Sequence, residues 1–450
     1  MRTGRKGARN VRLMAWPIGG IIEGFYGRPW TWDERADLMR FCHERGMTHY
    51  VYAPKSDPKH RDDWRSLYDD ADLDGFARLC GEDTLTVGFA ISPGLSIDYA
   101  SDDDRSALAA KVDQVIGVGI GLVVLALDDI PFGGGDQGRA HAVLTTWLRE
   151  HLGDRAELVL VPTEYVGTAA TPYLDALAEG VPRDVPIAWT GEAVVNDSIT
   201  AAQALVRSAS LGDRPPLVWD NYPVNDGIMT ERLHLGPLWG REKKLSERCS
   251  GYLANPMVQP HASKLPLASI AAWLRGEDPL DGWAAEAESF GWRVFAEACD
   301  GSVPQALVQH AIEWIDDDDG WDRATEPLRD WLRAATECTA PGIEQEVGAW
   351  LEQVHTEARL GLDGLKLVEH ARNGKFTKAI DQAFAAGIVW ASVRRADKSV
   401  MGPRFGLQPM LGQRTDGTWS FHAESILEDR NAIDALLRTC FKYYARRSLT

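Results

Sequence analysis

The sequence predicts an α/β protein, a (β/α)8 TIM barrel followed by a C-terminal all-α helical domain. Short apolar runs alternate with helix-like segments through residues 18–275, and beyond this region only helical spacing continues. Eight strand–helix units over about 260 residues match such a barrel in number and length. We therefore divide the chain into an N-terminal extension (1–16), a barrel (17–276) and a helical bundle domain (277–450).

Eight apolar runs are predicted to be strands buried on both faces. They are Ile18–Phe25, Thr48–Ala53, Thr86–Ile91, Gly121–Ile130, Glu157–Val161, Pro186–Trp189, Leu217–Trp219 and Gly251–Leu253. A doubly wound parallel sheet is the alternative. It is disfavoured because no run is followed by the Gly-x-Gly-x-x-Gly turn that is typical of that fold.

Segments with apolar residues three and four positions apart are predicted to be helices. In the barrel they are Asp33–Arg45, Asp70–Cys80, Asp103–Ile116, Arg139–Leu152, Pro172–Ala178, Ile199–Ser208, Glu231–Arg248 and Ser263–Arg275. Beyond it they are Trp283–Cys299, Val303–Ile315, Ala324–Cys338, Ile343–Glu357, Leu360–Arg372, Lys375–Arg395 and Ala423–Tyr443, and Gly402–Gly417 is expected to be irregular. Their apolar stripes form a bundle core or, less often, a groove for a partner, so a homodimer through the helical domain stays open.

Composition and charge exclude several classes of function. The chain has 450 residues and a formal net charge of −18, which disfavours a surface that follows a nucleic acid or another polyanion. No apolar run approaches the length of a transmembrane helix. The six cysteines lie far apart without a Cys-x-x-Cys pair, which indicates free thiols in a reducing compartment. We expect a cytoplasmic protein without metal, cofactor, nucleic-acid or membrane partner.

Polar or aromatic residues follow every predicted strand, at the end where (β/α)8 barrels carry their active sites. Asp128 and Asp129 follow the fourth strand, and two carboxylates are costly there unless something uses them. From this stretch alone, a helix cap by Asp129 and an ion pair of Asp128 are as good an explanation. The other strand ends are Glu23–Trp30, Tyr52–Asp57, Ser92–Gly94, Pro162–Tyr165, Trp189–Glu192, Trp219–Asn221 and Asn255–Pro256. Helix caps alone would not require polar residues at all eight.

Paired carboxylates with aromatic and amide neighbours suggest sugar chemistry. Neighbouring strand residues point to opposite faces, so Asp128 and Asp129 share a pocket only where the strand turns into a loop. Such a pair is awkward as nucleophile and acid across one bond, and it suits hydrolysis assisted by the sugar's own 2-acetamido group better. Candidates to wall the ring or bind its hydroxyls are Trp189, Trp219, Tyr165, Asn221, Asp226 and Asn255.

The strand-end motifs resemble those of glycoside hydrolase family 84, which comprises the O-GlcNAcases and bacterial β-N-acetylglucosaminidases often labelled hyaluronidases. The resemblance covers residues 18–275 in order. It is carried by Gly24–Trp30, Tyr52–Lys55 with Asp57-Pro58 and His60-Arg61, Asp128-Asp129, Pro162–Tyr165, Trp189–Gly191, and Trp219–Asn221 with Asn225-Asp226. It implies a retaining exo-β-N-acetylglucosaminidase that works by substrate assistance through an oxazoline.

The resemblance also implies a role for each site residue. Asp128 would orient the acetamido N–H, Asp129 would act as general acid and then as base, and Tyr165 would bind near the anomeric centre. The other implied contacts are hydroxyl binding by the Gly24 backbone, Lys55, Asn221, Asp226 and Asn255, and an acetamido wall at Trp219.

Structural roles remain open for several of these residues and their neighbours. The alternatives are an ion pair of Lys55 with Asp57 or Asp128, a turn at Asn255, a scaffold role for Tyr26 and Arg28, and a supporting hydrogen bond from Asp220.

Two other functions stay open. One is a catalytically inactive carbohydrate-binding or scaffold barrel, and the other is an endo-acting, hyaluronidase-like enzyme. The charge of −18 opposes a polyanionic polymer. The expected substrate is a β-N-acetylglucosaminide on a glycoprotein or a saccharide, and the sequence does not decide which.

Overall fold

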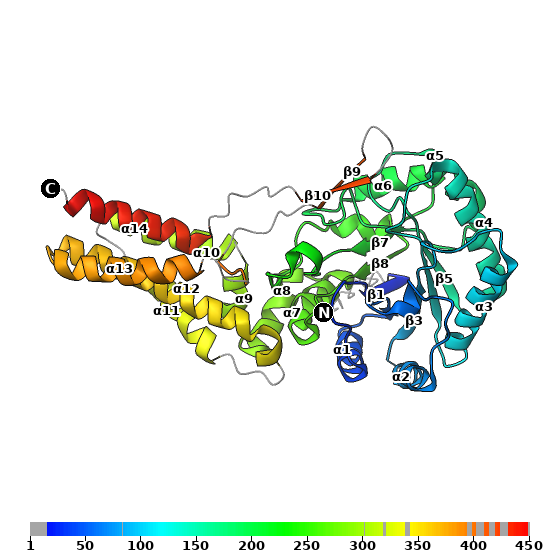
Figure 1. The fold of residues 1–450 in the computed structure, drawn as a ribbon, viewed down its shortest axis with the longest axis horizontal. Coiled ribbons are helices and arrows are strands. Elements are labelled where there is room, and N and C mark those ends of the chain that lie inside the picture. The colour runs from blue at the N-terminus through cyan, green and yellow to red at the C-terminus, as the bar shows by residue number, and fades with distance from the viewer. Residues whose placement is uncertain are drawn as a thin grey trace, which may run out of the picture.

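The computed structural model describes most of the chain between Trp16 and Ser448. The described residues are 16–82, 84–300, 302–317, 321–337, 343–393, 398–401, 409–413, 419–423 and 431–448. The predicted N-terminal extension (1–16) lies outside them except for Trp16, as does Cys338. A barrel lies at one end of the molecule and an elongated helical bundle extends from it (Figure 1).

Eight parallel strands form the barrel. They are β1 (Ile18–Glu23), β2 (His49–Tyr52), β3 (Thr86–Ile91), β4 (Leu122–Ala126), β5 (Glu157–Val161), β6 (Ala188–Trp189), β7 (Leu217–Asp220) and β8 (Gly251–Ala254). Neighbours in the chain pair with one another, β1 pairs with β8, and a bridge from Leu160 to Ile187 joins β5 to the residues just before β6. The sheet is therefore closed. The (β/α)8 prediction is confirmed, and the doubly wound alternative is wrong.

Seven helices surround or follow these strands. They are α1 (Trp32–Glu44), α2 (Asp70–Gly81), α3 (Asp102–Ile116), α4 (Gly134–Leu152), α5 (Pro172–Gly180), α6 (Ala201–Ser210) and α7 (Pro260–Leu274). Two of them begin with a capping box, Thr31 with Glu34 in α1 and Thr200 with Gln203 in α6. Each box satisfies N–H groups that the first helical turn leaves free, and a cap of this kind contributes about 1 kcal/mol.

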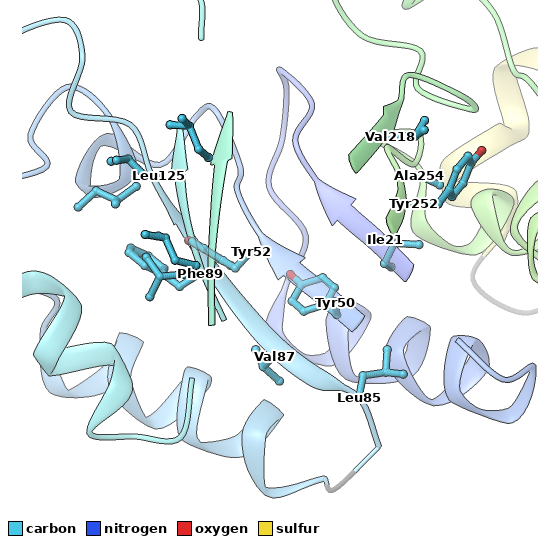
Figure 2. Packing of buried hydrophobic residues seen from close by; sticks show 14 of the residues in the cluster. Ile21, Tyr50, Tyr52, Leu85, Val87, Phe89, Leu125, Val218, Tyr252 and Ala254 are labelled. Atoms are coloured by element: carbon cyan, nitrogen blue, oxygen red, sulfur yellow. The ribbon is translucent and has the colours of Figure 1, made fainter. Parts of the chain in front are cut away.

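Strand side chains alternate between two apolar layers, because successive residues of a strand point to opposite faces. Ile22, Val51, Val124 and Leu253 fill the barrel interior, together with Trp219 near the carboxyl end of β7. The outward-facing residues pack between the strands and the helices, and Figure 2 shows several of them, among them Ile21, Tyr50, Phe89 and Tyr252.

The segment between β7 and β8 contains no α-helix, so the predicted helix Glu231–Arg248 is wrong. It contains two short 3-10 helices, η2 (Gly227–Met229) and η3 (Lys243–Glu247), and of these only η3 lies within the predicted helix. Pro237 lacks the N–H that a helix interior requires, and Gly240 has a φ of 69°, outside the helical region. The segment instead packs against the C-terminal helices, where Leu235 is buried and its carbonyl accepts a hydrogen bond from Trp283.

The C-terminal region is helical, as predicted. It contains α8 (Pro279–Phe290), α9 (Arg293–Cys299), α10 (Ser302–Asp317), α11 (Trp321–Glu337), α12 (Ile343–Arg372), α13 (Phe376–Val393) and α14 (Ala432–Ser448). One predicted helix is divided into α8 and α9 by Gly291, which is left-handed with a φ of 66°. Two other predicted helices are continuous as the 30 residues of α12. Within the described residues, no helix is both long and apolar enough to cross a membrane.

The stretch predicted to be irregular, Gly402–Gly417, contains a strand. Its β9 (Pro409–Gln413) pairs antiparallel with β10 (Trp419–Ala423), and the rest of the stretch lies outside the described residues. The last helix consequently begins at Ala432 and not at Ala423, which ends β10.

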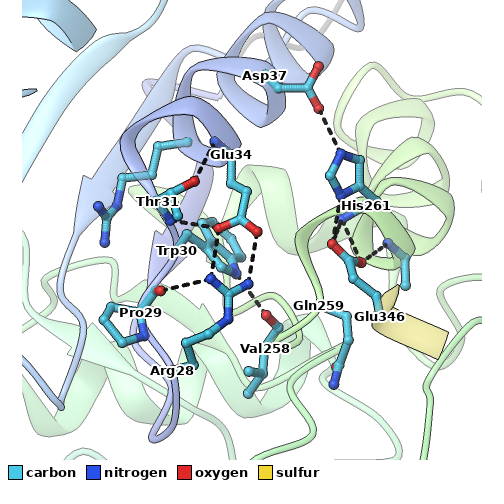
Figure 3. Close-up of polar contacts among 12 residues, drawn as sticks. Arg28, Pro29, Trp30, Thr31, Glu34, Asp37, Val258, Gln259, His261 and Glu346 are labelled. Atoms are coloured by element: carbon cyan, nitrogen blue, oxygen red, sulfur yellow. Dashed lines mark hydrogen bonds and ion pairs between the residues drawn. The ribbon is translucent and has the colours of Figure 1, made fainter. Parts of the chain in front are cut away.

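A carboxylate from α12 attaches the helical region to the barrel (Figure 3). Glu346 accepts hydrogen bonds from the backbone N–H groups of His261 and Ala262 at the start of α7, and it lies 2.6 Å from His261 Nδ1. It therefore caps a helix whose own N-cap residue, Gln259, provides no side-chain bond. The hydrogen bond to Glu346 raises the pKa of His261, although its partial burial opposes this. Asp37 lies 3.8 Å from the other ring nitrogen.

We predict that Glu346→Gln destabilises the protein more at acid than at alkaline pH. A raised histidine pKa means that the stabilisation is complete below the ordinary value of 6.5 and is lost as the pH rises through the raised value. The melting temperature should fall by an amount that corresponds to about 1 kcal/mol at pH 5.5 and by less at pH 8.5. The exposed Glu352→Gln on the same helix is the control. Equal differences at both pH values would contradict the prediction.

Candidate active site

Loops at the carboxyl ends of the strands enclose a cavity of about 550 Å³. It lies where (β/α)8 barrels bind their ligands and has a volume typical of small-molecule sites. All nine residues that the sequence predicts for the site line it: Gly24, Lys55, Asp128, Asp129, Tyr165, Trp219, Asn221, Asp226 and Asn255. Other lining residues are Tyr26, Val161, Ala188, Trp189, Thr190, Val194, Val195, Val224, Gly227, Ile228 and Met229.

A backbone turn brings both aspartates into this cavity. Asp129 has a φ of 53°, a left-handed conformation that costs most non-glycine residues about 1–2 kcal/mol and that aspartate tolerates better than most. The turn breaks the alternation of the strand, so that Asp128 and Asp129 line the same space. Asp129 does not cap the next helix, because α4 has Gly133 as its N-cap and no side-chain cap bond.

Asp128 is nearly buried and forms an ion pair with Lys55 from the end of β2. Lys55 Nζ lies 2.7 Å from Asp128 Oδ2 and 3.9 Å from Asp129 Oδ2, and the side chains of Lys55 and Asp128 are 3% and 8% exposed. Burial alone would lower the pKa of Lys55, but the two carboxylates raise it above its ordinary value. The ion pair that the sequence leaves open as a structural role therefore exists, and it lies inside the cavity.

The two oxygens of Asp128 differ in their surroundings. Among the described residues, Oδ1 is a buried atom without a hydrogen-bond partner. A buried carboxylate oxygen without a donor is unfavourable, and most buried polar atoms in proteins are hydrogen-bonded. This atom is therefore a ready acceptor for an N–H or O–H group of a bound molecule.

Asp129 is more open, with a side chain that is 33% exposed, and two tyrosines hold it. Tyr165 donates to Oδ1 and Tyr26 donates to Oδ2, each at 3.0 Å. Burial and the charges of Asp129 and Asp128 raise the pKa of Tyr165 well above its usual range. Burial and the charge of Asp129 likewise raise the pKa of Tyr26. Both hydroxyls therefore stay protonated and donate.

Tyr26 is a residue that the sequence interpretation underrates, because it lines the cavity and contacts Asp129. The sequence signal for this role is its position in the strand end Glu23–Trp30, two residues after the predicted site residue Gly24. Arg28, by contrast, lies outside the cavity lining and forms two hydrogen bonds to Glu34, which caps α1 (Figure 3). A scaffold role therefore fits Arg28 and not Tyr26.

A chain of fixed amides forms another wall. The Asn221 Oδ1 atom accepts hydrogen bonds from Trp219 Nε1 at 2.9 Å and from Asn255 Nδ2 at 3.0 Å, and Asn255 Oδ1 accepts from the Gly24 N–H at 3.2 Å. A Cβ atom at Gly24 would lie 2.4 Å from the Trp219 ring, so a side chain there would collide with the indole. These contacts orient each amide before any ligand arrives.

Asp226 joins the loop after β7 to the loop after β1. Its Oδ2 accepts a hydrogen bond from the Tyr26 N–H at 2.6 Å, across 200 residues of sequence. Burial raises the pKa of Asp226. The carboxylate retains capacity to accept further hydrogen bonds, as a binder of ligand hydroxyls requires.

Two other polar residues at the strand ends, Asp220 and Glu23, do not line the cavity. Asp220 is buried with two hydrogen bonds to Arg241, at 2.6 and 2.7 Å, and one from Tyr252. Glu23 is paired in the same way with Arg35, at 2.8 Å for both bonds. Neither carboxylate lines the cavity, so both stabilise the barrel and not a ligand. A supporting role for Asp220 agrees with the alternative that the sequence leaves open.

Comparison with known proteins agrees with this geometry. A family model described as β-N-acetylglucosaminidase matches residues 19–296. The chain is 32% identical over 273 residues to the protein O-GlcNAcases of Rattus norvegicus and Mus musculus, and the aligned region is 57% of this chain and 30% of each relative. The chain thus spans about 30% of the length of these curated relatives.

Two solved structures have similar folds. A mutant of the Thermobaculum terrenum O-GlcNAc hydrolase matches with a TM-score of 0.80 and 25% identity, over 96% of this chain and 95% of that one. The structure of CpGH84B matches with a TM-score of 0.76 over 85% of this chain and 74% of that one, and at 22% identity it supports the fold alone. With the family match covering more than half of the sequence, the chain belongs to the β-N-acetylglucosaminidase family of glycoside hydrolases.

Proposed function

We propose that the protein is a retaining exo-β-N-acetylglucosaminidase that hydrolyses terminal β-linked N-acetylglucosamine by substrate-assisted catalysis. One observation carries the proposal: two consecutive aspartates share a cavity and have different surroundings. Asp128 is buried beside a lysine and has one oxygen without a donor among the described residues, whereas Asp129 is a third exposed and held by two hydroxyls. Carboxylates in unlike surroundings are suited to unlike tasks.

Asp128 serves the 2-acetamido group of the sugar. Lys55 donates a hydrogen bond to Asp128 Oδ2, and Asp128 Oδ1 accepts a hydrogen bond from the acetamido N–H. This hydrogen bond increases the electron density on the acetamido oxygen, which is the nucleophile. Because the substrate itself carries the nucleophile, no protein carboxylate has to lie on the far side of the anomeric carbon.

Asp129 acts as the general acid in the first step and as the general base in the second. In the first, the acetamido oxygen bonds to the anomeric carbon, the bond to the leaving oxygen breaks, and the Asp129 proton moves to that oxygen. In the second, Asp129 takes a proton from water as the water oxygen attacks the anomeric carbon and the oxazoline ring opens. Each step inverts the anomeric centre, so the configuration is retained. The Tyr165 hydroxyl donates a hydrogen bond to Asp129 Oδ1 at 3.0 Å and thereby stabilises this carboxylate in both steps.

The fixed wall binds the sugar. The amides of Asn221 and Asn255, the carboxylate of Asp226 and the backbone of Gly24 bind ring hydroxyls, and the Trp219 indole packs against the acetamido group. A cavity of about 550 Å³ suits one terminal sugar better than an internal segment of polymer, which supports the exo mode.

The substrate class is a β-N-acetylglucosaminide on a glycoprotein or a saccharide. The mammalian relatives are protein O-GlcNAcases, but the chain spans only 30% of their length, so a protein substrate is a proposal for this chain. A cytoplasmic location is also proposed. It is supported by the separation of the cysteines, since the five described ones form no disulfide with one another.

A homodimer through the helical domain is the proposed assembly. Phe376, Ile380, Phe384 and Ile388 recur every four residues along α13, so they form one stripe on the helix. All four are exposed, Phe384 and Ile388 by 70% and 72%. An apolar stripe of this kind is typical of a protein–protein contact, and a second copy of the chain carries the matching stripe.

We predict that Asp129→Asn lowers kcat/KM for phenyl β-N-acetylglucosaminide by about 10²- to 10⁴-fold, because the leaving oxygen no longer receives a proton. The 2,4-dinitrophenyl substrate, whose leaving group needs no proton, should lose far less. Asp136→Asn, an exposed aspartate of α4, is the control. Equal losses on both substrates would exclude an acid role for Asp129. A wild-type protein that cleaves no N-acetylhexosaminide would favour the inactive barrel.

Asp128→Asn should behave differently, because it impairs the nucleophile and not the leaving group. We predict a fall in kcat/KM of roughly 10²- to 10³-fold on both substrates. Binding of a thiazoline that mimics the oxazoline should weaken in parallel when it is measured by calorimetry. Full activity of this variant would contradict the assignment.

Replacement of the α13 stripe should separate the dimer. We predict that Phe384→Glu with Ile388→Glu shifts the mass measured by light scattering from dimer to monomer, because charges cannot be buried in the contact. Lys378→Glu, exposed on the same helix, should leave the mass unchanged. A monomeric wild-type protein at micromolar concentration would contradict the proposal.

A further inference from the structure

One arginine outside the cavity holds the proposed general acid in place. Arg61 follows the 3-10 helix η1 (Pro58–His60), and its side chain is 11% exposed. Its Nη2 donates to the backbone carbonyl of Asp129 at 3.0 Å, and its Nη1 donates to the Tyr26 hydroxyl at 3.3 Å. Arg61 is not among the residues that line the cavity, so it does not reach the sugar.

The bond to the carbonyl acts on a strained part of the backbone. Asp129 is left-handed, with a φ of 53°, and relaxation of this turn would move its carboxylate within the cavity. Arg61 is fixed to the scaffold, since its N–H donates to the Pro58 carbonyl and the carbonyl of its neighbour His60 accepts from the Ser92 N–H. The guanidinium therefore connects the turn after β4 to the ends of β2 and β3.

The bond to Tyr26 sets the direction of a proton. A guanidinium can only donate, so the Tyr26 oxygen must accept from Arg61. The hydroxyl proton is then directed to Asp129 Oδ2, 3.0 Å away. One planar group thus holds the backbone of Asp129 and also its carboxylate, through Tyr26 and through an ion pair of 3.9 Å between Arg61 Nη1 and Asp129 Oδ2. The ammonium of a lysine is a single point and lacks the rigid fork that reaches two acceptors at once.

We propose that Arg61 is a positioning residue of the hydrolytic reaction, which holds Asp129 in its left-handed turn and directs the Tyr26 hydroxyl to the Asp129 carboxylate. This inference rests on the function proposed above for Asp129. Loss of Arg61 leaves the sugar-binding wall intact and displaces only the group that protonates the leaving oxygen.

The test compares Arg61→Met, Arg61→Lys and Tyr26→Phe with wild type on two substrates, and Arg28→Met is the matched control from the neighbouring loop. For Arg61→Met we expect kcat/KM to fall about 100-fold on the phenyl substrate and less than about 5-fold on the 2,4-dinitrophenyl substrate. The affinity for the thiazoline should stay within about 3-fold, which also shows that the variant is folded. Arg61→Lys and Tyr26→Phe should show the same direction with smaller losses, and Arg28→Met should match wild type.

Each other outcome overturns a defined part of the account. Equal losses on both substrates, lost thiazoline binding in both Arg61 variants, or unchanged activity would each overturn the role of Arg61. If the Asp129→Asn variant still loses far more activity on the phenyl substrate than on the 2,4-dinitrophenyl substrate, the proposed function stands even when the role of Arg61 is overturned. A wild-type protein that is inactive on both substrates would overturn the proposed function and this inference together.

Discussion

The site depends on one constraint, which is that two carboxylates must be held side by side at the end of a buried strand. The structure meets it with two cations and a turn. Lys55 pairs with Asp128, Arg61 holds the backbone of Asp129, and the left-handed turn brings both side chains to one cavity. Removal of one partner from a buried ion pair typically costs about 3–5 kcal/mol, so Lys55 and Asp128 depend on each other. The three groups come from the ends of β2 and β4, and the pairing of both strands with β3 brings these ends together.

The same interactions give the two aspartates different characters. Asp128 is buried, and its Oδ2 forms an ion pair with Lys55. Its Oδ1 has no hydrogen-bond partner among the described residues and can accept a hydrogen bond from a ligand. Asp129 lies nearer the solvent and accepts hydrogen bonds from two tyrosine hydroxyls, one on each carboxylate oxygen. Asymmetry of this kind is what an enzyme needs when one acid group must stay fixed while its neighbour exchanges a proton.

Much of the fold and the list of lining residues could be predicted from the sequence. Apolar runs specify strands, and the carboxyl ends of parallel strands converge in a barrel, so residues after those runs are site candidates. The direction of a side chain at a strand end is less predictable, because one residue of register reverses it. Glu23 and Asp220 stand at strand ends beside predicted site residues, and they form buried pairs with Arg35 and Arg241 outside the cavity.

Tyr26 and Arg61 show what the sequence does not reveal. Both residues belong to motifs that carry the resemblance, but their roles come from contacts with Asp129, 103 and 68 residues away, which the motifs do not specify. The predicted helix Glu231–Arg248 failed for a different reason. Its apolar residues are divided between two cores, Leu233 and Leu235 with the C-terminal helices and Leu238 and Leu245 with the barrel, so they do not form one helical face. The loop that carries Asp226 is thereby packed between the barrel and the helical region.

The central claim is that the nucleophile belongs to the substrate and not to the protein. The most direct test measures kcat/KM for aryl β-glucosaminides whose N-acetyl group carries zero, one, two or three fluorine atoms. Fluorine withdraws electrons from the acetamido oxygen, so the account predicts a steep fall with each added fluorine. A rate that is independent of fluorination would contradict it and would require a nucleophile elsewhere in the cavity.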